Sequence, residues 1–172
     1  MSIFSKNYCQ GRYVPHNTEK CLNMNGALGA PSAPTYRSSW ELKFMKFCDK
    51  FDSILEWGSE VVKIPYISEV DGKSHQYITD FYFVCRDACD KITRYIIEVK
   101  PKSQVARLDE NFQLVYPDPP KTRTRKAIEN WQERCNAIRV NNSKWKAARV
   151  WCAQNGFVFK IITEEQILEK FK

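Results

Sequence analysis

Two acidic residues interrupt apolar stretches of this chain, and a lysine follows the second of them. Asp80 lies among aromatic and β-branched residues, and Glu98 and Lys100 close an apolar run that ends at Pro101. Alternation along a strand places Glu98 and Lys100 on one face, and proline cannot continue a ladder of backbone hydrogen bonds. A carboxylate and an ammonium group at the end of a buried strand indicate a site for a metal ion and a phosphate.

The loop at residues 85–91 relates Asp80 to Glu98. If the strands on its two sides pair symmetrically about Cys89, Asp80 lies opposite Glu98, with Cβ atoms about 5 Å apart. Carboxylates placed in this way repel each other, and a divalent cation between them would remove the repulsion, since carboxylate oxygens suit Mg²⁺. Lys100 on the same face could stabilise a phosphorane-like charge or orient an attacking water.

Each of these residues also has a purely structural interpretation. Asp80 could end a strand or cap a turn, and Glu98 with Lys100 could form a charge pair on a solvated edge strand. Residues 38–41 have the S-x-x-E spacing of a capping box, in which Glu41 returns to the backbone amide of the serine. Glu41 also lies beside the apolar stripe of its helix, where it can face the body of the protein, so both roles stay open.

Hydrophobic periodicity predicts the elements that position these residues. Aromatic residues at intervals of four, three and four indicate a helix over 38–50. The segment 54–57 is interpreted as a strand or a turn, and Asp71-Gly72 marks a turn between later strands. An antiparallel meander is therefore expected, with strands at 60–66, 75–84 and 92–100.

The second half of the chain predicts helices and one more strand. A helix is expected over 122–139, and a third helix starts at Ser143 as N-cap, because Asn141-Asn142-Ser143 interrupts the pattern. Gly156 ends that helix, and the strand 157–162 joins the sheet in parallel through a right-handed crossover. A short last helix starts at Thr163. The fold class is therefore α/β (α+β), a mixed central β-sheet flanked by helices.

Length and composition indicate one globular domain, and its positive charge suits either a polyanionic partner, most simply nucleic acid, or merely a soluble surface. The chain has 172 residues, a hydrophobic fraction of 43% and a net charge of +7. Residues 1–36 are rich in Asn, Gly, Pro and Ser, which predicts an extended arm, packed on the domain at 37–172 or on a partner subunit. No long apolar run is present, so no transmembrane span is expected, and seven scattered cysteines favour reduced thiols in a cytosolic setting.

Basic residues cluster where the second long helix begins. A helix N-terminus attracts phosphate, so we expect DNA contacts there that are largely independent of base sequence, although a solvated basic turn explains the same charges. The candidate DNA-binding residues are Lys121, Arg123, Arg125, Lys126 and Lys102.

These motifs together resemble the PD-(D/E)XK nuclease superfamily. Asp80, then Glu98-Val99-Lys100 after an apolar strand, with Glu41 on a leading helix, match its pattern, and Thr79 replaces the usual proline. The chain also resembles the head completion proteins of T4-like tailed phages, and its closing strand looks like that of TnsA-type transposon-end nucleases. The segments that carry these likenesses are 10–15, 36–44, 55–60, 80–82 and 156–164.

The resemblance implies a restriction-endonuclease-like fold and a Mg²⁺-dependent DNA endonuclease, with Mn²⁺ as an alternative ion. It implies that Asp80, Glu98, Glu41 and the Val99 carbonyl bind metal and that Lys100 assists the water or the scissile phosphate. The protein would process packaged DNA ends in the virion and the host cytoplasm. Portal or neck proteins are candidate partners, and neither a membrane nor a small-molecule cofactor is expected. The alternatives are a structural virion protein that does not cut DNA, and a nuclease subunit of a transposase or repair complex.

Overall fold

A four-stranded mixed sheet forms the centre of the computed structural model, which describes residues 9–26, 31–105, 107–111 and 113–170. Antiparallel pairings join β3 to β6 and β6 to β7. The last strand, β8, lies parallel to β7, and the sequence predicted this parallel addition to the sheet. In spatial order the strands are β3 (Ile54–Ser59), β6 (Phe81–Arg86), β7 (Ile92–Val99) and β8 (Val158–Ile162).

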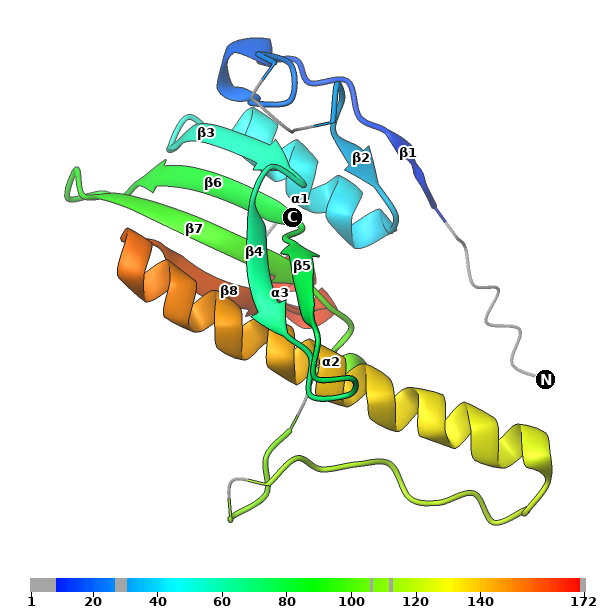
Figure 1. Cartoon of the computed structure of the whole chain (residues 1–172). Coiled ribbons are helices and arrows are strands. Elements are labelled where there is room, and N and C mark those ends of the chain that lie inside the picture. The colour runs from blue at the N-terminus through cyan, green and yellow to red at the C-terminus, as the bar shows by residue number, and fades with distance from the viewer. Residues whose placement is uncertain (1–8, 27–30, 106, 112, 171–172) are drawn as a thin grey trace.

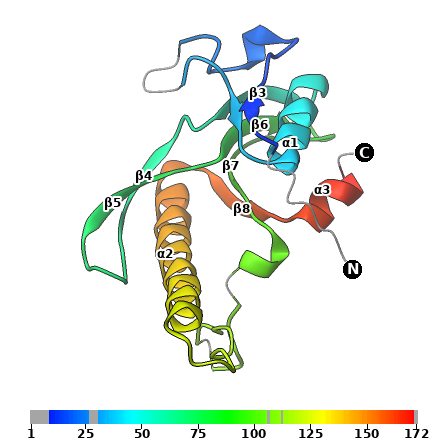
Figure 2. The same ribbon diagram turned by 90° about the vertical axis from the view of Figure 1, so that its right-hand side faces the viewer.

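Helices cover both faces of this sheet. One face carries α1 (Ser39–Lys50) and α3 (Glu164–Lys170), and the other carries α2 (Arg125–Asn155) (Figures 1 and 2). The hairpin of β4 (Lys63–Ile67) and β5 (Ser74–Ile78) leaves the sheet and packs against α2. The predicted fold class, a mixed sheet flanked by helices, is confirmed. None of the described helices combines the length and apolarity that a membrane span requires.

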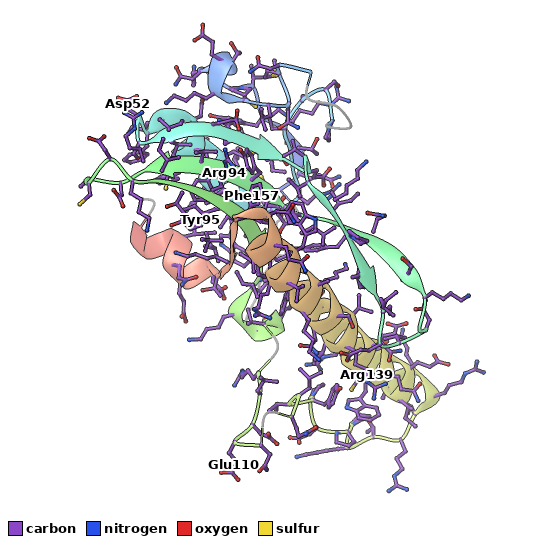
Figure 3. All side chains as sticks on the ribbon, turned by 60° about the vertical axis from the view of Figure 1, so that its left-hand side comes forward. Asp52, Arg94, Tyr95, Glu110, Arg139 and Phe157 are labelled. Atoms are coloured by element: carbon purple, nitrogen blue, oxygen red, sulfur yellow. The ribbon has the colours of Figure 1, made fainter. Side chains whose placement is uncertain are left out.

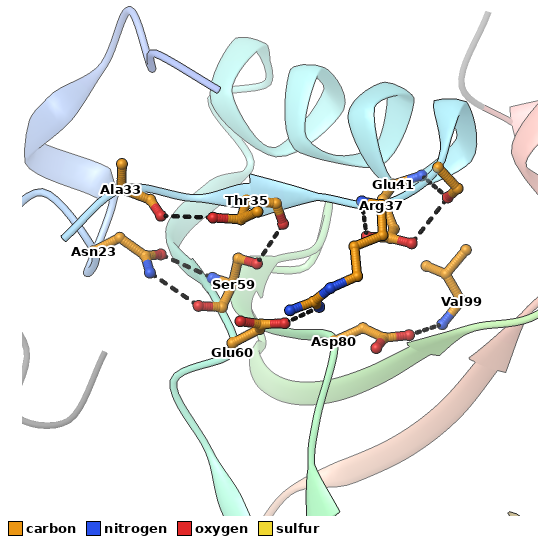
Figure 4. A network of polar contacts seen from close by, with 10 residues as sticks. Asn23, Ala33, Thr35, Arg37, Glu41, Ser59, Glu60, Asp80 and Val99 are labelled. Carbon is orange, nitrogen blue, oxygen red and sulfur yellow. Dashed lines mark hydrogen bonds and ion pairs between the residues drawn. The ribbon is translucent and has the colours of Figure 1, made fainter. Parts of the chain in front are cut away.

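Helix α1 forms as its sequence predicts. Ser38 is the N-cap, and its side chain accepts a hydrogen bond from the Glu41 amide. The apolar stripe buries Phe44, Met45 and Cys48 against the sheet, in the larger of two hydrophobic clusters. Because α1 begins at the same end of the sheet where β7 ends, its first turn lies close to the candidate site (Figure 4).

The predicted strand at 75–84 is two strands, which is the main correction to the expected meander. Up to Ile78 the chain pairs with β4, and from Phe81 it pairs with β3 and β7. The chain changes partner at Thr79 and Asp80: the Thr79 amide donates to the Val62 carbonyl, 3.0 Å away. Asp80 is therefore placed at a strand junction, where a residue with poor strand propensity is tolerated.

The predicted helix break at Asn141-Asn142-Ser143 is absent, and α2 is one helix of 31 residues. The polar side chains in its middle are buried against the β4–β5 hairpin and are hydrogen-bonded there. The Ser143 hydroxyl donates to the Arg139 carbonyl (3.0 Å) and accepts from the Glu69 amide (3.1 Å). A tertiary partner thus outweighs the weak helix propensity of Asn and Ser. Gly156 ends α2 at φ 72°, as predicted.

The N-terminal segment packs on the same chain where it is described. A small antiparallel pair, β1 (Gly11–Arg12) with β2 (Thr35–Tyr36), and a 3₁₀ turn (Thr18–Lys20) lie beside α1 and β3. Cys21 is fully buried and forms a parallel bridge with Trp57. Residues 1–8 and 27–30 of the predicted arm lie outside the described residues, and the boundary at residue 37 stays a prediction. A second 3₁₀ turn, Lys102–Gln104, follows β7.

Candidate active site

The hairpin of β6 and β7 brings Asp80 to Glu98. The ladder pairs Phe81 with Ile97 and runs symmetrically about the middle of the connecting loop, so the residue before Phe81 comes level with Glu98. Asp80 is fixed at this position because its Oδ2 accepts a hydrogen bond from the Val99 amide, 2.8 Å away. The predicted pairing across the hairpin is confirmed.

Glu98 is buried, with 3% of its surface exposed, and both of its carboxylate oxygens have partners. Lys100 lies one step further along the same face and places its Nζ 2.8 Å from Glu98 Oε1. The Tyr77 hydroxyl, on β5, donates to Oε2. The predicted shared face of Glu98 and Lys100 is therefore present, and Tyr77 is a partner that sequence reasoning missed. In the sequence, Tyr77 was indicated only by the alternation of inward and outward side chains along the strand, which turns it toward the interior.

The site concentrates charge in a poorly solvated place. Burial raises the pKa of Asp80 well above its usual range, and the nearby Glu98 carboxylate raises it further, whereas Lys100 and the Val99 amide act in the opposite direction. Burial would lower the pKa of Lys100, but Glu98, together with Asp80 and Glu41, raises it above its ordinary value. Lys100 is therefore an ammonium group at neutral pH, and the two carboxylates would be stabilised by a further cation.

Glu41 lies nearby but is engaged at the start of α1. Its carboxylate accepts hydrogen bonds from the Ser38 hydroxyl (2.9 Å) and from the Arg37 amide (2.8 Å) (Figure 4). The predicted capping box thus forms with one difference. The Glu41 carboxylate accepts its backbone hydrogen bond from the Arg37 amide and not from the Ser38 amide. Within the described residues, no three acidic, histidine or cysteine side chains come together as a group that could hold a metal ion. The Glu41 charge nevertheless acts on Asp80 and raises its pKa, and a role of Glu41 in metal binding stays a prediction.

Two further charged residues border the site. Arg37 forms an ion pair with Glu60, and the Glu60 amide donates to the Asp80 carbonyl oxygen, 3.1 Å away (Figure 4). Sequence reasoning assigned neither residue a role. Both, however, lie in segments that carry the family resemblance, 36–44 and 55–60, and this was the signal that could have found them.

The structure does not bring the predicted DNA-binding residues to the site. Arg125 and Lys126 begin α2, and Lys121 and Arg123 lie in the loop just before it. Lys144, further along the same helix, lies over the Tyr77 ring, 5.7 Å from its centroid. At 1.5 Å per residue, Arg125 is about 28 Å along the helix from Lys144. Figure 3 shows Arg139 on the part of α2 that projects beyond the sheet.

Lys102, the remaining candidate DNA-binding residue, is occupied by an acid of α3. Its Nζ lies 2.9 Å from Glu165 Oε2, and its amide donates to Glu164. Lys102 therefore helps to hold the end of β7 against α3 in this structure. A DNA phosphate would have to displace Glu165 to reach it.

Comparison with known proteins agrees with this geometry. The family model for the TnsA-like endonuclease N-terminal domain matches residues 51–164, a span that contains Asp80, Glu98 and Lys100 and begins after Glu41. A protein named head completion nuclease, from Enterobacteria phage T4, is 32% identical over 155 residues. That similarity covers 90% of this chain and 91% of the phage T4 protein.

Proposed function

Since this chain belongs to the TnsA-like endonuclease family and has its restriction-endonuclease-like fold, we propose that it is a metal-dependent DNA endonuclease of phage head completion. The observation that carries the proposal is the arrangement of Asp80, Glu98 and Lys100 at the end of one hairpin. The Val99 amide holds Asp80, and the Tyr77 hydroxyl and the Lys100 ammonium hold Glu98. A hairpin can fold without such a cluster of buried charges, so the cluster supports a catalytic role. The reaction would be the in-line hydrolysis of a phosphodiester bond.

The side chains at the hairpin end fit a divalent cation. Asp80 and Glu98 offer oxygen donors on one face, Val99 adds a backbone carbonyl, and burial together with mutual repulsion raises the pKa of Asp80. Oxygen donors of this kind suit Mg²⁺, and Mn²⁺ as well. When bound, the ion would act as a Lewis acid that activates water and neutralises phosphate charge. Glu41 would contribute through its charge, because its carboxylate caps α1.

The protein's own residues would supply orientation and positive charge. The Lys100 ammonium is held beside Glu98, from where it can donate to a phosphate oxygen or orient the attacking water. The Tyr77 hydroxyl fixes the Glu98 carboxylate from the opposite side. Such fixed groups need no rearrangement as charge develops, which is the main source of electrostatic catalysis.

The phage T4 relative's name supports a place for this activity in head completion. We infer that the protein trims or holds the end of the packaged DNA before the tail joins, in the virion and the host cytoplasm, with portal or neck proteins as partners. A net charge of +7 suits sequence-independent contact with DNA.

The proposal is tested with supercoiled plasmid incubated with Mg²⁺ or with EDTA. Wild type should nick the plasmid only with Mg²⁺, and Asp80→Asn should slow nicking about 100-fold or more. Asp118→Asn, a matched change in an exposed loop, should nick like wild type. Equal nicking by Asp80→Asn would refute the site. An inactive wild type that still binds DNA would support the structural virion protein instead.

A further inference from the structure

The ion pair of Arg37 and Glu60 lies beside the catalytic cluster, which comprises Asp80, Glu98 and Lys100. The Arg37 side chain is 63% exposed and that of Glu60 is 19% exposed. Arg37 directly precedes the N-cap of α1, and its own amide binds Glu41, so its backbone is fixed to the cluster while its guanidinium remains accessible. Figure 4 shows the guanidinium group reaching Glu60 beside Asp80.

The backbone at Glu60 is held in an uncommon conformation. Glu60 has φ 58°, in the left-handed region that non-glycine residues rarely adopt, at a cost of about 1 kcal/mol or more. In this conformation its amide donates to the Asp80 carbonyl, and its side chain is brought to Arg37. Strain of this kind gathers at functional sites, where the surrounding structure over-determines it.

The charge balance at the cluster favours an anion-binding role for the guanidinium. Three acids, Glu60, Glu41 and Asp80, act on the Arg37 guanidinium group, and Asp80 belongs to the proposed active site that a DNA phosphate must approach. The hydrogen bond to Glu60 raises the pKa of Arg37, and Glu41 and Asp80 raise it further, so the field of the cluster acts on this side chain. A phosphate approaching these acids needs an accessible cation, and the planar fork of arginine suits two phosphate oxygens.

We propose that Arg37 binds a phosphate of the DNA strand held at Asp80 and Glu98, and that Glu60 occupies Arg37 until this phosphate displaces it. The inference rests on the proposed function in one respect, because it takes DNA as the ligand of the cluster. It adds a pair of residues with opposite effects: Arg37 favours binding, and Glu60 competes with the substrate for the same guanidinium group.

A binding experiment without divalent cation tests this pair separately from cleavage. The probe is a fluorescein-labelled DNA duplex titrated with protein in EDTA, with fluorescence anisotropy as the readout. Arg37→Gln should weaken binding about tenfold, as expected for one lost charge-assisted contact. Glu60→Gln should tighten binding, because it releases the guanidinium group. When Arg37→Gln is already present, adding Glu60→Gln should raise the DNA affinity only by the small amount expected from removing one acidic charge. Arg37→Lys should bind more tightly than Arg37→Gln but more weakly than wild type, because lysine lacks the planar fork.

The control is Arg86→Gln, which removes a similar exposed arginine, paired with Asp90, from the far end of β6. It should bind DNA nearly as wild type does, and melting temperatures should show that all variants are folded. If the ion pair is only structural, Arg37→Gln and Glu60→Gln will act in the same direction, and this result overturns the inference, as does a wild type that binds no DNA. A protein that never nicks DNA but shows the opposite effects would refute the nuclease proposal and leave the inference standing.

Discussion

Within the site, each charged side chain depends on one or two specific partners. Glu98 is buried between the Tyr77 hydroxyl and the Lys100 ammonium, and Asp80 is fixed by the Val99 amide. A buried carboxylate that loses a donor keeps its desolvation cost, so single-atom changes at these partners should be measurable.

The Tyr77 hydroxyl can be removed with little change of shape. Tyr77→Phe keeps the ring under Lys144 but removes one hydrogen bond to Glu98. Because a hydrogen bond to a charged group is worth about 1.5–3 kcal/mol, the variant should cleave about 10- to 100-fold more slowly. Single-turnover rates across pH measure the effect. Tyr66→Phe removes a hydroxyl from the other strand of the hairpin and should leave the rate unchanged. Equal rates for both variants would show that Tyr77 only fills space.

The helices and strands around the site are held by polar contacts between elements distant in sequence. The β4–β5 hairpin is fastened to the middle of α2 by Ser143 and Glu69, and this contact places Tyr77 over Glu98. On the other face, Asp49 of α1 accepts hydrogen bonds from the amides of His16 and Asn17 and from the Tyr13 hydroxyl. These contacts dock the hairpin and the N-terminal segment on the core.

Ser143→Ala tests the contact between hairpin and helix. The Glu69 amide would lose its acceptor, so the free energy of unfolding should fall by about 1–2 kcal/mol, and hydrogen exchange at that amide should accelerate. Thermal unfolding measures the loss, with Ser39→Ala in the exposed first turn of α1 as the matched control. If the two variants melt alike, the Ser143 contact does not stabilise the docking of the hairpin, which then depends on its apolar face and on the contacts of Asn142 and Lys146 with Glu69.

Asp49→Asn tests the docking of the N-terminal segment through pH. Burial acts to raise the pKa of Asp49, but its three donors lower it below the usual value. The Asp49 carboxylate therefore stabilises the folded protein fully above the pKa of the unfolded chain, about 3.9. This stabilisation disappears as the pH falls through the lower pKa that Asp49 has in the folded protein. Asp49→Asn should lower the melting temperature at pH 7 and differ less from wild type below pH about 4.

The exposed neighbour Asp52 provides the control for this measurement. Asp52→Asn should change the melting temperature little at either pH, because that carboxylate is fully exposed and its contact with Lys20 spans 3.7 Å. If the melting temperatures of Asp49→Asn and wild type differ by the same amount from pH 3 to pH 7, the stabilisation does not depend on the Asp49 charge. This result would contradict the docking role assigned to that carboxylate.

At the scale of the whole molecule, the proposed active site lies apart from the basic residues around the start of α2. The first half of α2 extends past the sheet, accompanied by the loop before it, to which Trp131 is tied through the Pro117 carbonyl (Figure 1). A long DNA duplex could contact both regions at once, whereas a short one could contact only one of them.

The salt dependence of DNA binding tests the role of the helix start. With a duplex long enough for both regions, Arg123→Gln with Lys126→Gln should weaken binding and reduce the slope of log K against log salt by about 2. Lys43→Gln with Lys46→Gln, on the exposed side of α1, removes the same charge and should change the slope less. Equal slopes for the two double variants would show that only net charge matters.

The sequence was most informative where local rules act. The capping of α1 by Ser38, the end of α2 at Gly156, and the pairing of residue 80 with residue 98 follow from propensity, glycine geometry and hairpin symmetry. These features involve neighbours on one element or across one short loop. They also suffice to place Asp80, Glu98 and Lys100 together.

Features that depend on a distant partner were predicted wrongly or missed. The break expected at Ser143 is bridged because Glu69 lies against the helix, and the strand expected at 75–84 divides because the chain changes partners at Thr79. The ion pair of Arg37 with Glu60 joins residues 23 positions apart. The hydrophobic periodicity of a sequence cannot predict such contacts, because they form only when distant segments come together in the folded sheet.

The most direct test of the site is the removal of one lysine, with a second lysine as the control. Lys100→Met should reduce the single-turnover rate of DNA cleavage with Mg²⁺ by about 100-fold or more, because it removes the cation beside Glu98. Lys160→Met removes an ammonium group from the neighbouring strand β8, where it lies over the Tyr95 ring, and should cleave as wild type does. Equal cleavage by the two variants would contradict the assignment of the site.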